Sequence, residues 1–158
     1  MSATLQPGQP APDFCLMGDD GKEHDLRSFR GRTLILYFYP RDATPGCTTE
    51  ARDFRDLHPA LLARGAVVVG VSPDSVESHR RFRAKEGLPF LLLSDPEGRT
   101  AAAYGAFGEK VRYGKRVQGI LRSTFIIDPE GRIQAVYPNV RVKGHAAAVA
   151  AALGATSP

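Results

Sequence analysis

Short apolar runs alternate along this chain with longer amphipathic stretches. The run 33–39 (TLILYFY) is almost wholly apolar and rich in residues that favour strands, and 66–72 (AVVVGVS) and 89–95 (PFLLLSD) have a similar character. Runs of this length and composition are typical of strands buried inside a sheet. We therefore predict three strands, with 33–39 at the core of the sheet.

Helical patterns follow each of these strands. Residues 46–64 carry apolar side chains at helical spacing, although Pro59 should kink or interrupt this helix. Ser75 can cap a second helix that runs to about Lys85, and shorter helices are predicted over 99–105 and 144–154. The order β, α, β, α, β indicates a parallel portion of the sheet.

Two hairpins complete the pattern. Residues 12–26 contain a DDG turn between two extended pieces, in which Cys15 should point away from the face of Phe14. Residues 123–138 form a second hairpin around a DPEG turn, whereas 107–117 is broken by glycine and reads as a loop or an irregular strand. We predict an α/β fold: a mixed central sheet with helices on both faces and an N-terminal β-hairpin.

Length and composition favour one soluble domain. The 158 residues, 42% of them hydrophobic, can bury a real core, and no repeat or linker divides them. We therefore expect a single domain over residues 1–158. No stretch approaches the roughly 18 to 20 apolar residues that span a bilayer, and residues 1–14 lack the basic start and apolar run of a secretion signal. The expected location is the cytoplasm.

Charge and metal-binding residues narrow the function only slightly. The two cysteines and four histidines show no zinc-like spacing, so we predict neither a metal nor a cofactor. The net charge is 21 − 17 = +4, with basic residues gathered in 79–85 and 109–116. Short mixed-charge runs are usually solvated faces, but a nucleic-acid-binding or chaperone-like protein that uses these segments stays open as an alternative.

Cys47 is the candidate reactive thiol. It follows the strand 33–39 and lies in the first turn of the helix predicted over 46–64. An ordinary thiol is only about 3% ionised at pH 7, and the thiolate is the nucleophile. The free backbone N–H groups and the dipole of a helix N-terminus both stabilise negative charge there. For Cys15, which lies mid-hairpin without such a setting, we expect a structural role.

The segment PRDATPGC has the form P-x-x-x-T-x-x-C and resembles the active-site motif of the peroxiredoxins, which are thiol-dependent peroxidases with a thioredoxin-like fold. The wider run YFYPRDATPGCTTEARDFRD resembles the subgroup called bacterioferritin comigratory protein (BCP) or PrxQ. The likeness extends over about residues 8–153. It implies reduction of hydrogen peroxide and organic hydroperoxides, an antioxidant role in cell redox homeostasis, and a monomer.

The resemblance assigns roles to four residues. Cys47 attacks the peroxide and becomes a sulfenic acid, and the Thr44 hydroxyl and the backbone N–H groups near Cys47 hold the oxygens as bonds stretch. Pro40 gives an apolar wall that limits water near the sulfur. Arg122, which opens the segment RSTFIID, matches the arginine that stabilises the thiolate and the transition state.

Other charged residues lie closer to Cys47 in the sequence than Arg122 does. Arg41 and Arg52 are nearer to Cys47 in sequence, but arginines are abundant in this chain, so Arg122 remains the choice. Glu50 falls on the same helix face as Cys47, about 60° away, where it would disfavour the thiolate unless it is paired. It either forms a structural ion pair or orients a basic residue.

The chain departs from its relatives at the second thiol. Many members of the subgroup carry a resolving cysteine five residues after the first, where this chain has Arg52, and the second predicted helix contains no cysteine either. We therefore predict a one-cysteine enzyme that is reduced by an external thiol: thioredoxin, glutaredoxin or a small thiol. The alternative is that Cys15 resolves the sulfenic acid. A C-x-x-C disulfide exchanger is excluded because Glu50 holds the fourth position.

Overall fold

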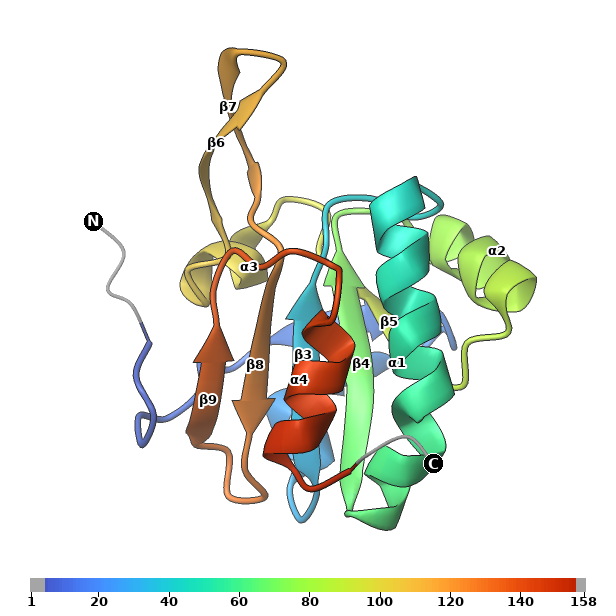
Figure 1. Ribbon diagram of the computed structural model, residues 1–158, viewed down its shortest axis with the longest axis vertical. Helices are drawn as coiled ribbons and strands as arrows, with labels where there is room; N and C mark the ends of the chain where they lie inside the picture. The colour runs from blue at the N-terminus through green and yellow to red at the C-terminus, as the bar shows by residue number, and fades with distance from the viewer. Residues whose placement is uncertain (1–4, 156–158) are drawn as a thin grey trace.

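The computed structural model describes residues 5–155. Its main sheet has seven strands in the order β2-β1-β5-β4-β3-β8-β9, and β6 and β7 form a separate two-stranded hairpin (Figure 1). The strands are β1 (Cys15–Gly18), β2 (Glu23–Asp25), β3 (Thr33–Phe38), β4 (Ala66–Ser72), β5 (Leu91–Ser94), β6 (Phe107–Arg112), β7 (Lys115–Ile120), β8 (Ser123–Ile127) and β9 (Ile133–Tyr137).

The sheet is mixed, as the sequence predicts. β3 pairs with β4 in parallel from Thr33↔Ala66 to Phe38↔Val71, and β4 pairs with β5 in parallel. β8 is antiparallel to β3, and β9 and the β1–β2 hairpin add further antiparallel edges. The predicted hairpins at both ends and the central place of β3 are thus confirmed.

Helices cover both faces of this sheet. The α-helices are α1 (Pro45–Ala63), α2 (Val76–Glu86), α3 (Arg99–Ala103) and α4 (His145–Ala152), and η1 (Leu26–Phe29) is a 3₁₀ turn. Helices α1 and α4 lie side by side in front of the sheet in Figure 1, with α2 beside α1 and α3 behind. Helix α1 continues through Pro59 without the predicted interruption, and Pro59 lies on its exposed side.

The strict alternation of β3 divides the core into two clusters. Ile35 and Tyr37 point towards α1, α2 and α4, where they pack with Phe54, whereas Leu34 and Leu36 pack on the opposite face. All five of these side chains are buried. A fully apolar strand with helices or loops on both faces is what the sequence of 33–39 requires.

One element was predicted wrongly. Residues 107–117 are not a loop or irregular strand but most of a regular hairpin, in which Phe107 pairs with Ile120 and Arg112 with Lys115. Tyr113 and Gly114 both have positive φ, 53° and 76°, as the two central residues of a type I′ hairpin turn require. Glycine at 114 therefore forms the hairpin rather than breaking it.

Topology brings two distant segments together at one end of the sheet. β3 runs towards this end and is followed by the loop 40–44 and the start of α1, while β8 starts there because it is antiparallel to β3 (Figure 1). The first turn of α1 thus lies near the residue that precedes Ser123 of β8. That residue is Arg122.

Candidate active site

Cys47 lies in the first turn of α1. Thr44 is the N-cap, Pro45 occupies the first helical position, where its missing N–H is not needed, and Cys47 is the third helical residue. The Cys47 side chain is buried, at 1% exposure, against the tyrosine-rich end of the core that includes Tyr37 and Tyr39. The predicted helix-start position of this thiol is confirmed.

Arg122 reaches the sulfur from the neighbouring segment. Its Nη2 atom donates to Cys47 Sγ over 3.4 Å, and its side chain is 16% exposed. The approach depends on Gly46, because a Cβ atom at that position would lie 3.3 Å from Nη2 of Arg122. The structure therefore joins Cys47 to the arginine chosen from the sequence, 75 residues away.

Glu50 holds the other side of the same guanidinium. Arg122 Nη1 donates to Glu50 Oε1 over 2.6 Å, and Glu50 is only 1% exposed. Burial raises the pKa of Glu50 to about 7, although the positive charge of Arg122 acts in the opposite direction. The sequence leaves two roles open for Glu50, an ion pair and the orientation of a basic residue. The geometry combines them, because the ion pair with Arg122 also orients the guanidinium.

The two remaining predicted residues lie beside this group without a described bond to the sulfur. The Thr44 hydroxyl donates to the Arg41 carbonyl oxygen over 2.9 Å and makes no side-chain cap to the helix. Pro40 follows directly after β3 and is partly buried. The roles of Thr44 and Pro40 towards a bound peroxide stay predictions.

A buried histidine contacts the strand that follows Arg122. His145 Nε2 lies 2.6 Å from the Thr124 hydroxyl, two residues from Arg122 along the chain. Burial, and to a lesser degree the Arg122 charge, lowers the pKa of His145 to about 4, so the ring is neutral at pH 7. The Arg122 carbonyl also accepts from Val140 N–H over 2.7 Å. The two contacts tie the arginine segment to the start of α4 and to the loop that precedes it.

The second cysteine occupies a different setting. Cys15 lies exposed in β1, and its Sγ donates to Glu23 Oε2 over 3.4 Å. That hydrogen bond raises the pKa of the Cys15 thiol. Strands β5 and β4 lie between β1 and β3, which at about 4.8 Å per step separates β1 from β3 by about 14 Å. A disulfide needs Cα atoms within about 7 Å, and the structure places the two cysteines on different elements, Cys15 on β1 and Cys47 on α1.

Arg52, at the position where relatives often carry a second thiol, has a structural partner instead. Its Nε atom donates to Glu86 Oε1 over 2.6 Å, and this bond lowers the pKa of Glu86. Arg55 Nη1 also donates to the Glu86 carbonyl oxygen over 2.8 Å. Two arginines of α1 therefore bind the last residue of α2 and hold the two helices together.

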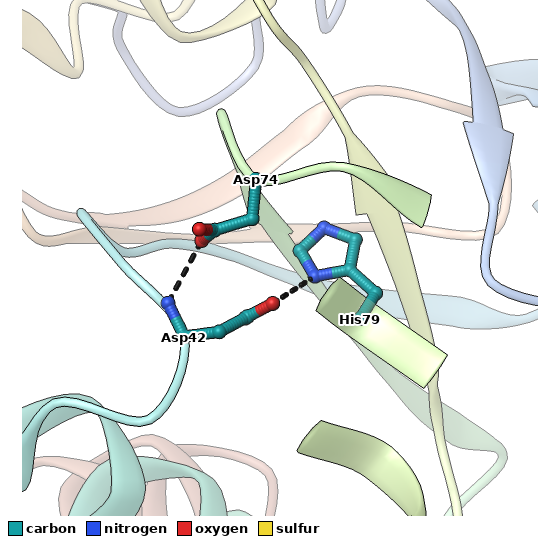
Figure 2. A group of neighbouring side chains, drawn as sticks. All are labelled: Asp42, Asp74 and His79. Atoms are coloured by element: carbon teal, nitrogen blue, oxygen red, sulfur yellow. Dashed lines mark hydrogen bonds and ion pairs between the residues drawn. The ribbon is translucent and has the colours of Figure 1, made fainter. Parts of the chain in front are cut away.

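Sequence reasoning missed a buried polar cluster next to the site. Asp42, Asp74 and His79 point towards one another in Figure 2, and their facing N and O atoms all lie within 4.8 Å. Such donor atoms can hold a metal ion in principle. Here, however, His79 Nδ1 already lies 2.7 Å from Asp42 Oδ2, and Asp74 Oδ2 accepts from the backbone N–H of Asp42 over 2.8 Å. The atoms are engaged with one another as a hydrogen-bond network.

A spacing in the sequence indicates that His79 is buried, although it does not identify the partners of this residue. His79 and Phe82 stand three residues apart and share the buried face of α2, so a histidine at position 79 had to find polar partners inside the protein. We interpreted it only as part of a basic run. In the structure His79 and Phe82 are buried, Arg83 Nη1 pairs with Asp19 Oδ2 over 2.9 Å, and Arg80 Nε donates to the Asp19 carbonyl. Three of the five basic residues in this run, His79, Arg80 and Arg83, therefore bind partners within the protein.

Comparison with known proteins assigns the chain to a family. The model of the AhpC/TSA family matches residues 7–136. Peroxiredoxin Bcp of Bacillus subtilis is 50% identical over 144 residues, which cover 91% of this chain and 92% of that protein. Peroxiredoxin Bcp of Xanthomonas campestris is 48% identical over 143 residues, which cover 90% and 89%.

Solved structures agree with the sequence relatives. A structure of the Xanthomonas campestris bacterioferritin comigratory protein, studied for its alkyl peroxide reduction activity, superimposes with a TM-score of 0.87 at 44% identity and covers 95% of this chain and 98% of that one. A PrxQ mutant from Xylella fastidiosa superimposes with a TM-score of 0.90 at 38% identity and covers 97% and 98%.

The protein has a thioredoxin-like fold with a thiol at a helix start, and the relatives and solved structures described above are all peroxiredoxins. Together these features define a thiol peroxidase. The chain belongs to the AhpC/TSA family, in its Bcp/PrxQ group of peroxiredoxins. It is an enzyme, its substrate is a peroxide, and its reductant is a thiol. No helix among residues 5–155 is long and apolar enough to cross a membrane.

Proposed function

We propose that Cys47 is the peroxide-reactive residue and that the enzyme works with this one cysteine. The observation that carries the proposal is the contact of Cys47 Sγ with Arg122 at the start of α1, whereas Cys15 lies exposed on β1, with β5 and β4 between that strand and β3. The helix N-terminus and the guanidinium both favour negative charge on the sulfur. Cys15 has instead a carboxylate partner, Glu23, which disfavours the thiolate.

In the oxidation step the Cys47 thiolate attacks one peroxide oxygen. The S–O bond forms as the O–O bond breaks, and the other oxygen leaves as an alkoxide or hydroxide that takes a proton from solvent. The sulfur is oxidised to a sulfenic acid and the peroxide is reduced to an alcohol or water. Arg122 is positioned to stabilise the charge that shifts from sulfur to oxygen, and Thr44 and the first N–H groups of α1 supply further donors.

The sulfenic acid is reduced from outside. A thiolate of the reductant attacks the Cys47 sulfur, an S–S bond forms as the S–O bond breaks, and the oxygen leaves as hydroxide that takes a proton from solvent to become water. A second thiol of the reductant then attacks this mixed disulfide, which returns Cys47 to the thiol and leaves the reductant oxidised. The pairing of Arg52 with Glu86 supports this route, because the position that would carry a resolving thiol instead joins α1 to α2.

A groove beside the thiol supports organic hydroperoxides as substrates alongside hydrogen peroxide. It has a volume of about 460 Å³, and Pro45, Gly46 and Val142 give it apolar walls, with Asp53 and Lys143 among its other residues. Gly46 directly precedes Cys47, so one wall of the groove adjoins the reactive thiol in the chain. An alkyl group bound there would place its peroxide end towards Cys47.

The proposed mechanism is tested by comparing Cys47→Ser with Cys15→Ser in a peroxidase assay. Hydrogen peroxide and an organic hydroperoxide serve as substrates, with thioredoxin, glutaredoxin and a small thiol each offered as reductant. Cys47→Ser should abolish turnover with every pair, and Cys15→Ser should keep nearly all of it. Equal losses in the two variants would overturn the one-cysteine mechanism and make Cys15 the resolving residue.

The wider setting of the enzyme is also a proposal. We propose that residues 1–158 act as one peroxiredoxin domain, because both core clusters pack against the same seven-stranded sheet. We further propose that the protein is a monomer of the cytoplasm. Sedimentation of the reduced and oxidised protein at several concentrations tests the monomer, since a dimer would show a concentration-dependent mass.

A further inference from the structure

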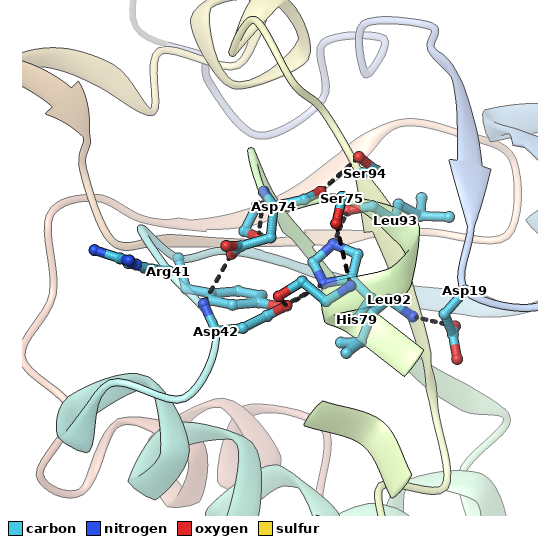
Figure 3. Close-up of polar contacts among 12 residues, drawn as sticks. Asp19, Arg41, Asp42, Asp74, Ser75, His79, Leu92, Leu93 and Ser94 are labelled. Carbon is cyan, nitrogen blue, oxygen red and sulfur yellow. Dashed lines mark hydrogen bonds and ion pairs between the residues drawn. The ribbon is translucent and has the colours of Figure 1, made fainter. Parts of the chain in front are cut away.

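A buried network connects the loop before Cys47 to helix α2. It comprises Tyr39, Asp42, Asp74, Ser78 and His79, and we call it the Asp42 network. Figure 3 labels three of its members, Asp42, Asp74 and His79. Asp42 belongs to the loop 40–44, and Ser78 and His79 belong to α2. None of these residues has a role in the reaction as proposed above, yet Asp42 lies only five residues before Cys47 in the chain.

The Asp42 carboxylate lies at the centre of the network. Its Oδ1 accepts from the Tyr39 hydroxyl over 2.5 Å, and its Oδ2 accepts from the Ser78 hydroxyl over 2.8 Å and lies 2.7 Å from His79 Nδ1. The side chains of Asp42 and His79 are 3% and 0% exposed. A carboxylate buried to this degree needs a compensating charge and several donors, and both are present.

The surroundings of His79 indicate which protons its ring carries. Nδ1 faces the Asp42 carboxylate, and Nε2 lies 2.9 Å from the Leu93 carbonyl oxygen, which can only accept. A neutral imidazole has one donor nitrogen and one acceptor nitrogen, whereas the imidazolium has two donors. Two facing acceptor oxygens match a ring that carries a proton on each nitrogen.

The loop is also held through its backbone. The N–H of Asp42 donates to Asp74 Oδ2 over 2.8 Å, and the Ser72 hydroxyl donates to the same oxygen over 2.6 Å. Asp42 is thus fixed at its backbone and at both carboxylate oxygens. The anchoring groups come from the end of β4, the loop that follows it and the first turn of α2.

The residue after Asp42 shows why such anchoring matters. Ala43 has φ of 63°, in the left-handed region that a non-glycine residue rarely adopts. Such strain persists only where the surrounding structure holds it, and it occurs preferentially at functional sites. Ala43 stands between Asp42 and Thr44, the N-cap of α1. Released from Asp42, the loop could relax and shift the start of the helix that carries Cys47.

We propose that His79 is a positioning residue for the peroxidase reaction: as an imidazolium bound to Asp42 and Leu93, it keeps Ala43 strained and so holds the loop 40–44 and the first turn of α1 in the reactive geometry. His79 acts through Asp42 and touches neither the thiol nor the peroxide. The inference rests on the proposed role of Cys47. Helix α2 thereby acts on the reaction indirectly: His79 holds the loop 40–44, and the loop positions the helix start that carries Cys47.

The test compares two reactions of the same thiol in His79→Asn. The first is the rate of Cys47 oxidation by hydrogen peroxide in a single turnover, which needs the aligned donors of the loop and helix start. The second is alkylation of Cys47 by iodoacetamide, which needs the thiolate but not those donors. We expect the ratio of the two rates to fall by roughly tenfold, because misplacing reactive groups by a fraction of an ångström has effects of this order. An unchanged ratio in a folded variant would overturn the proposal.

A matched control and a rescue exclude a general loss of stability. His58 is also a buried histidine, but it lies further along α1 and takes no part in the network, so His58→Asn should leave the ratio unchanged. Adding Ala43→Gly to His79→Asn should restore the ratio by roughly threefold, because glycine adopts the left-handed conformation without strain. A decrease of the same size in His58→Asn, or no restoration by glycine, would contradict a positioning role.

The protonation state is tested by nitrogen NMR of the ring. In the reduced wild-type protein at neutral pH, both nitrogens of His79 should show the shifts of protonated imidazolium nitrogens. Asp42→Asn, which removes the negative partner, should convert them to one protonated and one unprotonated nitrogen. A neutral ring in the wild type would overturn the proposed cation.

Milder variants keep the proposal testable if His79→Asn does not fold. Tyr39→Phe and Ser78→Ala each remove one donor to Asp42 and little else, so each should lower the ratio by a smaller factor of roughly two to three. No effect from either would count against the network. Failure of the proposed function would look different: wild-type Cys47 would itself resist peroxide, whatever the state of His79.

Discussion

The two thiols of this chain lie in opposite electrostatic surroundings. Cys47 is buried at the N-terminus of α1 and accepts a hydrogen bond from the Arg122 guanidinium. Cys15 is exposed in an edge hairpin and donates a hydrogen bond to the Glu23 carboxylate. The chain therefore stabilises negative charge at the buried sulfur and opposes it at the exposed one. Accessibility alone would rank the two thiols in the reverse order, so the reactivity proposed for Cys47 rests on charge and geometry.

The largest effect on this comparison should come from Arg122. In Arg122→Gln the sulfur loses its cationic donor, and the rate of Cys47 oxidation by peroxide, followed by stopped flow, should fall by roughly 10²- to 10³-fold, as for other lost transition-state donors. Arg122→Lys keeps the charge but not the two-sided contact with Cys47 and Glu50. Its oxidation rate should lie between those of wild type and Arg122→Gln.

The control for Arg122 is Arg116→Gln. Arg116 is an exposed arginine of β7 whose side chain pairs with Glu109. Its replacement should leave the oxidation rate within twofold of wild type. A similar result for Arg122→Gln would mean that the helix start alone activates Cys47.

A smaller effect should come from Glu50→Gln. Without its carboxylate partner at 2.6 Å, the Arg122 guanidinium loses the contact that aims it at Cys47, and we expect the oxidation rate to fall by roughly tenfold. An unchanged rate would show that Arg122 needs no orienting partner. A rate that rose would show that the negative charge of Glu50 is felt mainly by the thiolate.

The raised pKa of Glu50 also predicts that stability depends on pH, with Glu50→Gln as the reference protein. The pKa of Glu50 is raised from 4.5 to about 7 in the folded protein, so the folded state takes up this proton first as the pH falls. The free energy of unfolding of wild type, relative to Glu50→Gln, should therefore rise as the pH falls from about 8 to about 5. The gain is up to about 3 kcal/mol, since each pKa unit corresponds to about 1.4 kcal/mol. Urea unfolding of both proteins measures it, and a difference that shrinks or stays constant would contradict the raised pKa.

Val142→Asp should change substrate preference more than overall activity. A carboxylate in the apolar wall of the groove beside Gly46 should lower the rate with an alkyl hydroperoxide by roughly fivefold relative to hydrogen peroxide, because the alkyl group would meet a charged wall. Competition between the two peroxides gives this ratio directly. If both rates change equally, the groove does not bind the alkyl group.

The smallest effect should be at the other thiol. Glu23→Gln removes the carboxylate that raises the pKa of Cys15, so alkylation of Cys15 at pH 8 should become about twofold faster. Cys47, measured in the same digest by peptide mass spectrometry, is the internal control and should not change. If Cys15 did not respond, its low reactivity would need another cause than Glu23.

Much of this fold can be predicted from the sequence because its patterns are local. The apolar run of β3, the Ser75 cap and the DPEG turn each specify their own element, and the structure contains all three. The hairpin over 107–120 was missed because its decisive feature is a backbone conformation, positive φ at Tyr113 and Gly114, that composition does not reveal.

The site divides in the same way. The helix start at Cys47 is local, and Arg122 could be placed only through the resemblance to peroxiredoxins, because its contact spans 75 residues. The pairing of Glu50 with Arg122 and the burial of His79 against Asp42 depend on packing between separate elements. Neither follows from spacing alone, and both required the structure.

The central claim is tested most directly by mass spectrometry of the reduced wild-type protein after one equivalent of peroxide. With a sulfenic-acid trap present and no reductant, the account predicts one added oxygen, trapped on Cys47, in nearly every molecule, with Cys15 still a free thiol. A stoichiometric disulfide between Cys15 and Cys47 would contradict it, since it would require these two thiols to meet across the sheet that separates them.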